Sequence, residues 1–201
     1  MSTTQMELTP RIQRRLLELA RRSIEFGLEE GRPLPVSPDA WEPQLWHHAA
    51  TFVTLHRAGR LRGCIGTVEP IRPLPRDVAY NAYAAAFHDP RFPPLDRSEW
   101  FDLTIDISIL GRPQPIEVTS EEDLLRQIRP GIDGLILQAG SRQGLFLPAV
   151  WESLPQPERF VRQLKLKAGL PADAWSPAWR FYRFEVESFG ESNGSRDDGR
   201  E

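Results

Sequence analysis

The chain has 201 residues, of which 40% are hydrophobic, and a formal net charge of −3. These values predict one folded domain with a sizeable core and argue against pervasive disorder. The acidic balance disfavours generic binding to nucleic acid, which needs a basic surface. A single cysteine excludes an internal disulfide and any cysteine-rich zinc or iron–sulfur site.

The N-terminus, MSTTQMELTPRIQRR, lacks the apolar core of a signal peptide. No apolar run approaches the roughly 20 residues that a membrane-spanning helix needs. We therefore expect a cytoplasmic protein in a reducing compartment. Residues 1–8 are expected to be flexible, residues 9–189 to fold, and residues 190–201, which are polar and Gly-rich, to form a disordered tail.

The first half of the chain predicts a helix, a loop, a hairpin and a second helix. The first helix spans residues 9–28, with Thr9 as N-cap and Pro10 at the first helical position. A Pro- and Trp-rich stretch at 33–48 is interpreted as an ordered loop. The next predicted elements are a strand at 50–55, a turn at 57–60, a strand at 61–68 and an Ala-rich helix at 76–87.

The second half shows strict alternation at residues 103–109, LTIDISI, which predicts a strand with an apolar face and a polar face. The polar face carries Thr104, Asp106 and Ser108. The remaining predicted elements are a capped helix at 120–128, a hairpin at 134–139 and 145–147, a helix at 157–168 and a strand at 180–189. Because strands and helices mix without βαβ regularity, we predict an α+β fold with a mixed, largely antiparallel sheet and flanking helices.

The segment Leu61–Thr67, LRGCIGT, closely resembles the signature of the AMMECR-one domain family. Four further segments resemble family blocks in the same order: 81–95, 131–137, 144–150 and 160–170. Five blocks in order are far more specific than one short motif, and they run from about Thr9 to Phe189.

The resemblance implies partners more than it implies a reaction. Family members in bacteria and archaea are often encoded beside, or fused to, a Memo-like protein and a radical-SAM protein. The chain is thus expected to be the A component of that three-part system. The resemblance also implies a larger and a smaller intertwined subdomain with a cleft, and a place near that cleft for the Arg-Gly-Cys block.

The motif itself suggests a site built around Cys64. Side chains alternate along a strand, so Arg62, Cys64 and Gly66 would share one face, with the first two Cα atoms roughly 6–7 Å apart. A guanidinium at that range can lower the pKa of a thiol. Gly63 and Gly66 would mark a β-bulge or a close approach of a ligand or of another backbone. Three interpretations of Cys64 stay open: a buried hydrophobe, a binding residue and a catalytic thiol.

Further candidate residues follow the second helix in the segment His88-Asp-Pro-Arg91. Asp89 and Arg91 match the family block and are predicted either to bind ligand or to form a structural ion pair or turn cap. His88 would supply a base near Cys64, but the residue before Asp-Pro-Arg-Phe varies in the family that the segment resembles. The predicted ligand-binding set is therefore Arg62, Gly63, Gly66, Thr67, Asp89 and Arg91.

No cofactor or metal is expected from the sequence. His47 and His48 are adjacent and point apart, and no carboxylate spacing supports a site that they would form with His56. Phosphate-binding loops and a radical-SAM cysteine triplet are absent. We expect an accessory protein that presents a small-molecule or peptide-binding cleft around RGCIGT. The alternative is an enzyme that uses Cys64 as nucleophile or acid/base on a small substrate.

Overall fold

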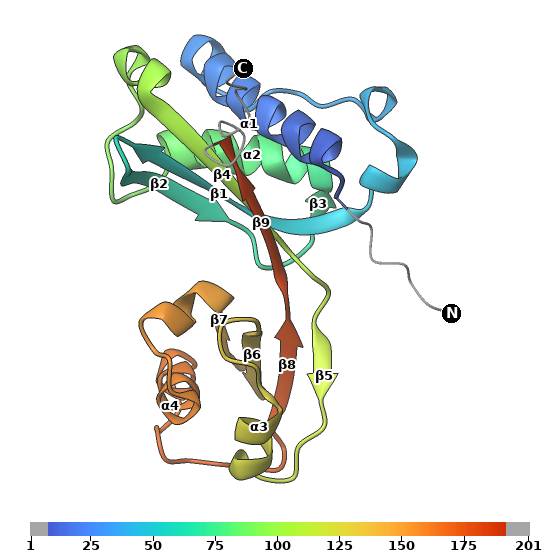
Figure 1. Ribbon diagram of the computed structural model, residues 1–201, viewed down its shortest axis with the longest axis vertical. Coiled ribbons are helices and arrows are strands. Elements are labelled where there is room, and N and C mark those ends of the chain that lie inside the picture. The colour runs from blue at the N-terminus through green and yellow to red at the C-terminus, as the bar shows by residue number, and fades with distance from the viewer. Residues whose placement is uncertain (1–7, 192–201) are drawn as a thin grey trace, which may run out of the picture. The chain divides into compact units, whose positions relative to one another are not determined.

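The structure, a computed structural model, describes residues 8–191 (Figure 1). Nearly all of the segment predicted to be flexible, 1–8, and of the tail predicted to be disordered, 190–201, lies outside the described residues. Backbone contacts divide the described chain into two compact units. The first comprises residues 8–109 and 188–191, and the second comprises residues 110–187, so the chain leaves the first unit once and returns to it.

The first unit combines a five-stranded sheet with two helices. The sheet, called the first sheet here, has the strand order β2-β1-β4-β9, and β3 pairs with β1. Helices α1 and α2 cover one of its faces (Figure 1). The elements are α1 (Pro10–Glu30), β1 (His48–Arg57), β2 (Arg60–Gly66), β3 (Arg72–Pro73), α2 (Leu74–Phe87), β4 (Leu103–Leu110) and β9 (Val186–Gly190), with short 3₁₀ helices at Pro38–Ala40, Pro43–Leu45 and Arg97–Asp102.

Local sequence signals explain both ends of α1. The Thr9 side chain accepts a hydrogen bond from the N–H of Ile12, and Pro10 occupies the first turn, where no N–H is needed. Gly31 ends the helix in the left-handed conformation, with φ 66°. The predicted helix is confirmed, and it runs two residues further than expected.

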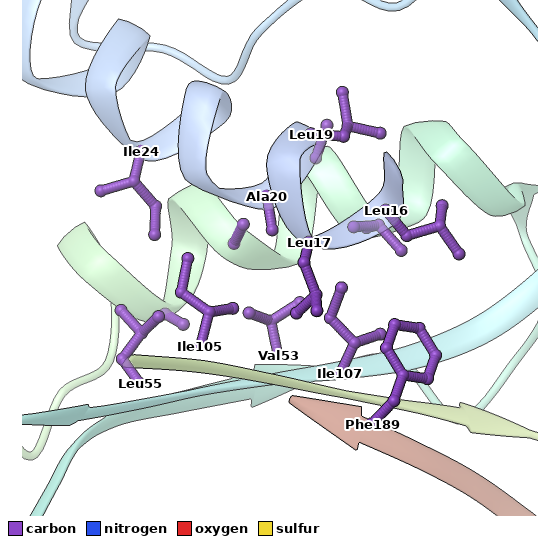
Figure 2. Packing of buried hydrophobic residues seen from close by; sticks show 14 of the residues in the cluster. Leu16, Leu17, Leu19, Ala20, Ile24, Val53, Leu55, Ile105, Ile107 and Phe189 are labelled. Carbon is purple, nitrogen blue, oxygen red and sulfur yellow. The ribbon is translucent and has the colours of Figure 1, made fainter. Parts of the chain in front are cut away.

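The core of the first unit lies between the helices and the first sheet (Figure 2). Leu16 and Ile24 of α1 face Val53 of β1 and Ile105 and Ile107 of β4, and all five side chains are fully buried. Because successive strand residues point to opposite faces, Thr104, Asp106 and Ser108 lie on the face of the sheet away from the helices. We call this the outer face.

The second unit packs helices on a four-stranded sheet with the order β5-β8-β6-β7, whose pairings are antiparallel. Trp151 anchors its core: the indole stacks on Phe160 at 3.7 Å between ring centroids and donates to the Asp133 carbonyl. The elements are β5 (Gln114–Ile116), α3 (Glu121–Gln127), β6 (Gly134–Ala139), β7 (Arg142–Phe146), a 3₁₀ helix (Pro148–Glu152), α4 (Pro157–Lys167) and β8 (Arg180–Phe184).

The α+β prediction is confirmed, and three local expectations need correction. The strand predicted at 180–189 is two strands, β8 and β9, which flank Glu185 and belong to different sheets. The second hairpin turns earlier than predicted, since Gly140 takes a φ of 63° and permits a tight turn before Arg142. The loop predicted at 33–48 contains two 3₁₀ turns. None of the helices between residues 8 and 191 combines the length and apolar character needed to span a bilayer.

Candidate functional site

Residues 62–66 of the RGCIGT motif lie in β2, at one edge of the first sheet, and Thr67 directly follows the strand. Cys64 lies opposite Thr54 and Gly63 lies opposite Leu55, but the register then slips, so that His56 pairs with Leu61. Arg62 is therefore the extra residue of a β-bulge. The bulge interrupts the alternation that would have placed Arg62 and Cys64 side by side.

Arg62 is engaged by Glu99 in the 3₁₀ helix before β4. Its Nε and Nη2 atoms donate to the two Glu99 carboxylate oxygens at 2.8 and 2.9 Å, and Nη2 also donates to the Pro93 carbonyl at 3.0 Å. This pairing lowers the pKa of Glu99 to about 2 and raises the pKa of Arg62. The guanidinium charge is thus balanced by Glu99, and the expected activation of Cys64 by Arg62 has no geometric support.

The two motif glycines permit close packing inside the protein. A Cβ atom on Gly63 would lie 2.1 Å from the Ala85 carbonyl oxygen of α2. A Cβ atom on Gly66 would lie 2.3 Å from the ring of Phe52 on β1. Gly63 therefore lets α2 approach the strand, and Gly66 makes room for an aromatic ring on the outer face.

Cys64 is partly exposed and does not lie in a closed apolar core. Its Sγ atom is 3.1 Å from Thr54 Oγ1 across the strand pair. Its backbone N–H donates to Asp89 Oδ2 at 2.8 Å, and its carbonyl accepts from Arg91 Nη2 at 3.3 Å. The Asp-Pro-Arg segment therefore satisfies edge-strand backbone groups that β1 does not bind.

Asp89 and Arg91 are brought to Cys64 as the sequence predicted, but they contact its backbone. Asp89 is buried, and it accepts three hydrogen bonds from Arg91, two from the guanidinium and one from the backbone N–H. These bonds, those of the guanidinium first, hold the pKa of Asp89 well below its ordinary value. His88 contacts Tyr83, with Nε2 3.2 Å from the phenolic oxygen.

Thr67 leads to a buried carboxylate that sequence analysis missed. Its hydroxyl donates to Oδ2 of Asp77, a fully buried residue in the first turn of α2. The same oxygen accepts from the Thr51 N–H and hydroxyl and from Asn81 Nδ2, while Oδ1 accepts from Arg72. The only sequence signal was an acidic residue beginning an otherwise Ala-rich helix. Thr67 thus serves to fix the end of the motif to α2.

A second polar pair missed from sequence lies on the outer face. His56 Nδ1 is 3.0 Å from Asp106 Oδ2, and the side chains are 33% and 41% exposed. The Asp106 carboxylate occupies the space above Gly190 of β9, where a Cβ atom would meet Oδ1 at 1.8 Å. The alternation at 103–109 had placed Asp106 on the polar face, but nothing in it pointed to His56.

Two cavities belong to the second unit alone. One of about 510 Å³ is lined by residues that include Pro130, Pro148 and Trp151, and one of about 230 Å³ lies between the ends of β5 and β8. Neither includes a residue of the predicted ligand-binding set. Between residues 8 and 191, no group of three or more His, Cys, Asp or Glu side chains is placed to hold a metal ion.

Comparisons with known proteins give one consistent family. The AMMECR1 family profile matches residues 17–189. A protein of Methanothermobacter thermautotrophicus is 40% identical over 184 residues, which cover 89% of this chain and 93% of that protein. A protein of Thermococcus gammatolerans is 42% identical over 187 residues, with 88% of each chain covered. The crystal structure of an uncharacterised protein from Pyrococcus horikoshii superimposes with a TM-score of 0.77 at 38% identity, covering 89% of this chain and 91% of that one.

Proposed function

Because this chain belongs to the AMMECR1 family, we propose that it is an accessory component of a three-protein system with a Memo-like protein and a radical-SAM protein. In this proposal it works in the cytoplasm and presents a binding site for a small molecule or peptide around residues 62–67. The family resemblance supports the choice of partners. The contacts of Cys64 support the place of the site.

One observation carries the proposal: Cys64, the motif residue with a thiol side chain, is partly exposed. Around it, Arg62 is paired with Glu99, Thr67 with Asp77, and the two glycines accommodate protein atoms. Cys64 is partly exposed on an ordered strand whose backbone is fixed on both sides. A rigid strand with one accessible polarisable group suits recognition, because little conformational freedom is lost on binding.

The contacts of the thiol favour binding over catalysis. The hydrogen-bond partner of Sγ is the Thr54 hydroxyl, which is not a general base at neutral pH. A nucleophilic cysteine needs a base within hydrogen-bond reach or a nearby unpaired cation. Both arginines of the predicted site instead form ion pairs with carboxylates, Arg62 with Glu99 and Arg91 with Asp89.

Isothermal titration calorimetry with a purified Memo-like partner tests the accessory role. We expect binding by the unaltered protein, weaker binding by Cys64→Ala, and unchanged binding by Glu158→Gln, a matched control on the exposed side of α4. No heat and no co-purification at high micromolar concentration would rule out direct contact with that partner.

The second candidate is an enzyme that uses Cys64, and the pair His56–Asp106 favours it. His56 lies two residues along β1 from Thr54, the residue opposite Cys64, and its ring is oriented by a carboxylate. Activity of Cys64→Ser in the reconstituted three-protein system decides between the two. Full activity excludes a catalytic thiol, whereas complete loss with an unchanged fold and unchanged partner binding favours the enzyme.

A further inference from the structure

We propose that the ligand of this site lies on the outer face beside Cys64. It carries an amine or another cationic N–H donor, which donates hydrogen bonds to His56 and Asp106. This inference rests on the proposed binding function and adds the chemical class of the ligand. Three features support it: the strand register, the place that Gly190 leaves for the Asp106 carboxylate, and the charges of the surrounding side chains.

The register brings the relevant side chains onto neighbouring strands. Cys64 of β2 lies directly opposite Thr54 of β1, and His56 follows two residues later on the same face of β1. Diagonal neighbours on one face of a sheet have Cα atoms about 7–8 Å apart. A ligand with a few heavy atoms therefore spans from the thiol to the imidazole.

Asp106 fixes the orientation of His56 from the next strand. In the tautomer whose Nδ1 donates to Asp106 Oδ2, Nε2 is left as a hydrogen-bond acceptor. The other oxygen of Asp106 lies where any side chain at position 190 would collide with it. The carboxylate thus occupies a place that Gly190 keeps open, and both acceptors, Nε2 and the carboxylate, belong to one ordered pair.

An apolar surface completes the site. The Phe52 ring lies over Gly66, two residues from Cys64 along β2, where any larger residue would displace it. Phe52 is itself two residues from Thr54 along β1, so aromatic surface and polar pair flank the Thr54–Cys64 contact on opposite sides. The site therefore offers an apolar wall at one end and acceptors at the other.

The charge balance selects a cation. Arg62 is neutralised by Glu99, and Arg91 by Asp89, so these four side chains contribute no net charge. Asp106, by contrast, pairs with a histidine and not with an arginine or lysine, so no permanent cation offsets its carboxylate. A unit charge about 7 Å away in a medium between protein and water changes the affinity of a charged group several-fold. An ammonium is favoured, and a carboxylate is disfavoured by a similar factor.

The single cysteine makes this testable by disulfide capture. The unaltered protein is equilibrated at pH 8 with 2-mercaptoethanol and one of three probes: cystamine, bis(2-hydroxyethyl) disulfide or 3,3′-dithiodipropionic acid. The Cys64 thiolate displaces one half of the probe as a free thiol and retains the other half as a mixed disulfide. Intact mass spectrometry gives the captured fraction, which is divided by the fraction captured in urea-unfolded protein.

We expect the aminoethyl adduct to exceed the carboxyethyl adduct roughly tenfold, with the hydroxyethyl adduct between them. Asp106→Asn should reduce that ratio several-fold, whereas His56→Ala should reduce it less, because it removes one acceptor and keeps the Asp106 carboxylate. Ser108→Ala, a matched change on the same strand face, should leave it unaltered. Equal capture of all three probes by the unaltered protein, or preference for the carboxylate, would overturn the inference, and this comparison needs no variant to fold. Such a result, combined with Cys64-dependent binding of the Memo-like partner, would leave the proposed function standing.

Discussion

Glu99 binds Arg62 through both carboxylate oxygens, although the two residues are 37 positions apart in the sequence. The pair also orders its surroundings, because Glu99 caps its own 3₁₀ helix by accepting from the Asp96 N–H. The most distinctive charged residue of the motif is therefore part of the framework that holds β2. Substitutions of Arg62 or Glu99 are therefore expected to affect the stability of the protein.

The pair Arg62–Glu99 predicts a loss of stability in acid. The pKa of Glu99 is about 2 in the folded protein, against an ordinary value of 4.5. A lowered folded pKa means that the stabilisation is fully present above pH 4.5 and is lost as the pH falls toward 2. Urea unfolding of the unaltered protein and of Glu99→Gln should differ by about 2 kcal/mol at pH 7 and by much less near pH 2.5.

Arg57→Ala is the control for that experiment. Arg57 also reaches Glu99, but at 3.3 Å and with 43% of its side chain exposed. Arg57→Ala should lower the free energy of unfolding by less than about 1 kcal/mol at either pH, because exposed ion pairs contribute little to stability. If the free energy of unfolding had the same pH dependence in the unaltered protein and in Glu99→Gln, the Arg62–Glu99 pair would not cause the loss of stability in acid.

Elements with local signals were predictable from sequence, and long-range polar partners were not. Thr9-Pro10 marked the start of α1, and the alternation at 103–109 identified both faces of β4, because each signal lies within a few residues. Nothing near Glu185 marked the point where the last strand passes from one sheet to the other. At that break the Glu185 carbonyl accepts a hydrogen bond from the N–H of Gly111, a residue distant in the sequence.

The candidate site shows the same division. The sequence assigned Cys64, Asp89 and Arg91, from two separate family blocks, to one predicted site, and the structure brings Asp89 and Arg91 to the Cys64 backbone. It missed Asp77 of α2 and Asp106 of β4, whose partners Thr51 and His56 both lie on β1, far away in the sequence. The expected effect of Arg62 on the thiol rested on uninterrupted alternation, and one bulged residue removes that basis.

Gly63→Ala should be much more damaging than Gly66→Ala. At position 63 the new methyl group meets the backbone oxygen of Ala85, which moves only with helix α2. At position 66 it meets the Phe52 side chain, which can change rotamer. We expect a loss of about 3 kcal/mol for Gly63→Ala and about 1–2 kcal/mol for Gly66→Ala in urea unfolding. The reverse order would mean that α2 does not rest directly on β2.

Lys165 in the second unit predicts an asymmetry between two variants. Its side chain is completely buried, and Nζ lies 2.5 Å from Glu121 Oε2, whose side chain remains 33% exposed. Lys165→Met removes the buried charge and leaves a carboxylate that water can solvate, so stability should change by less than about 1 kcal/mol. Glu121→Ala leaves the buried Lys165 ammonium without its carboxylate partner and should lower the free energy of unfolding by about 3–5 kcal/mol.

Thermal and urea unfolding of the two variants check this asymmetry. Glu122→Ala serves as a control, because Glu122 is exposed in the first turn of the same helix, α3. A loss for Lys165→Met as large as that for Glu121→Ala would indicate that the amine makes additional contacts essential to the core.

Hydrogen exchange at the Cys64 amide tests whether Asp89 protects the edge of β2. The N–H of Cys64 donates to Asp89 Oδ2 at 2.8 Å, and Asp89 is almost wholly buried. Asp89→Ala removes the acceptor, and since a hydrogen bond of this kind contributes about 1–2 kcal/mol to local stability, exchange should accelerate roughly tenfold or more. Arg91→Gln retains the Asp89 carboxylate and should accelerate exchange less, because Arg91 contacts the Cys64 carbonyl, at 3.3 Å, and not the Cys64 N–H. The Thr54 amide on β1 is the internal reference for global unfolding. If the Cys64 and Thr54 amides accelerated equally in Asp89→Ala, Asp89 would stabilise the unit as a whole, whereas acceleration confined to Cys64 identifies it as the residue that closes the edge of the strand.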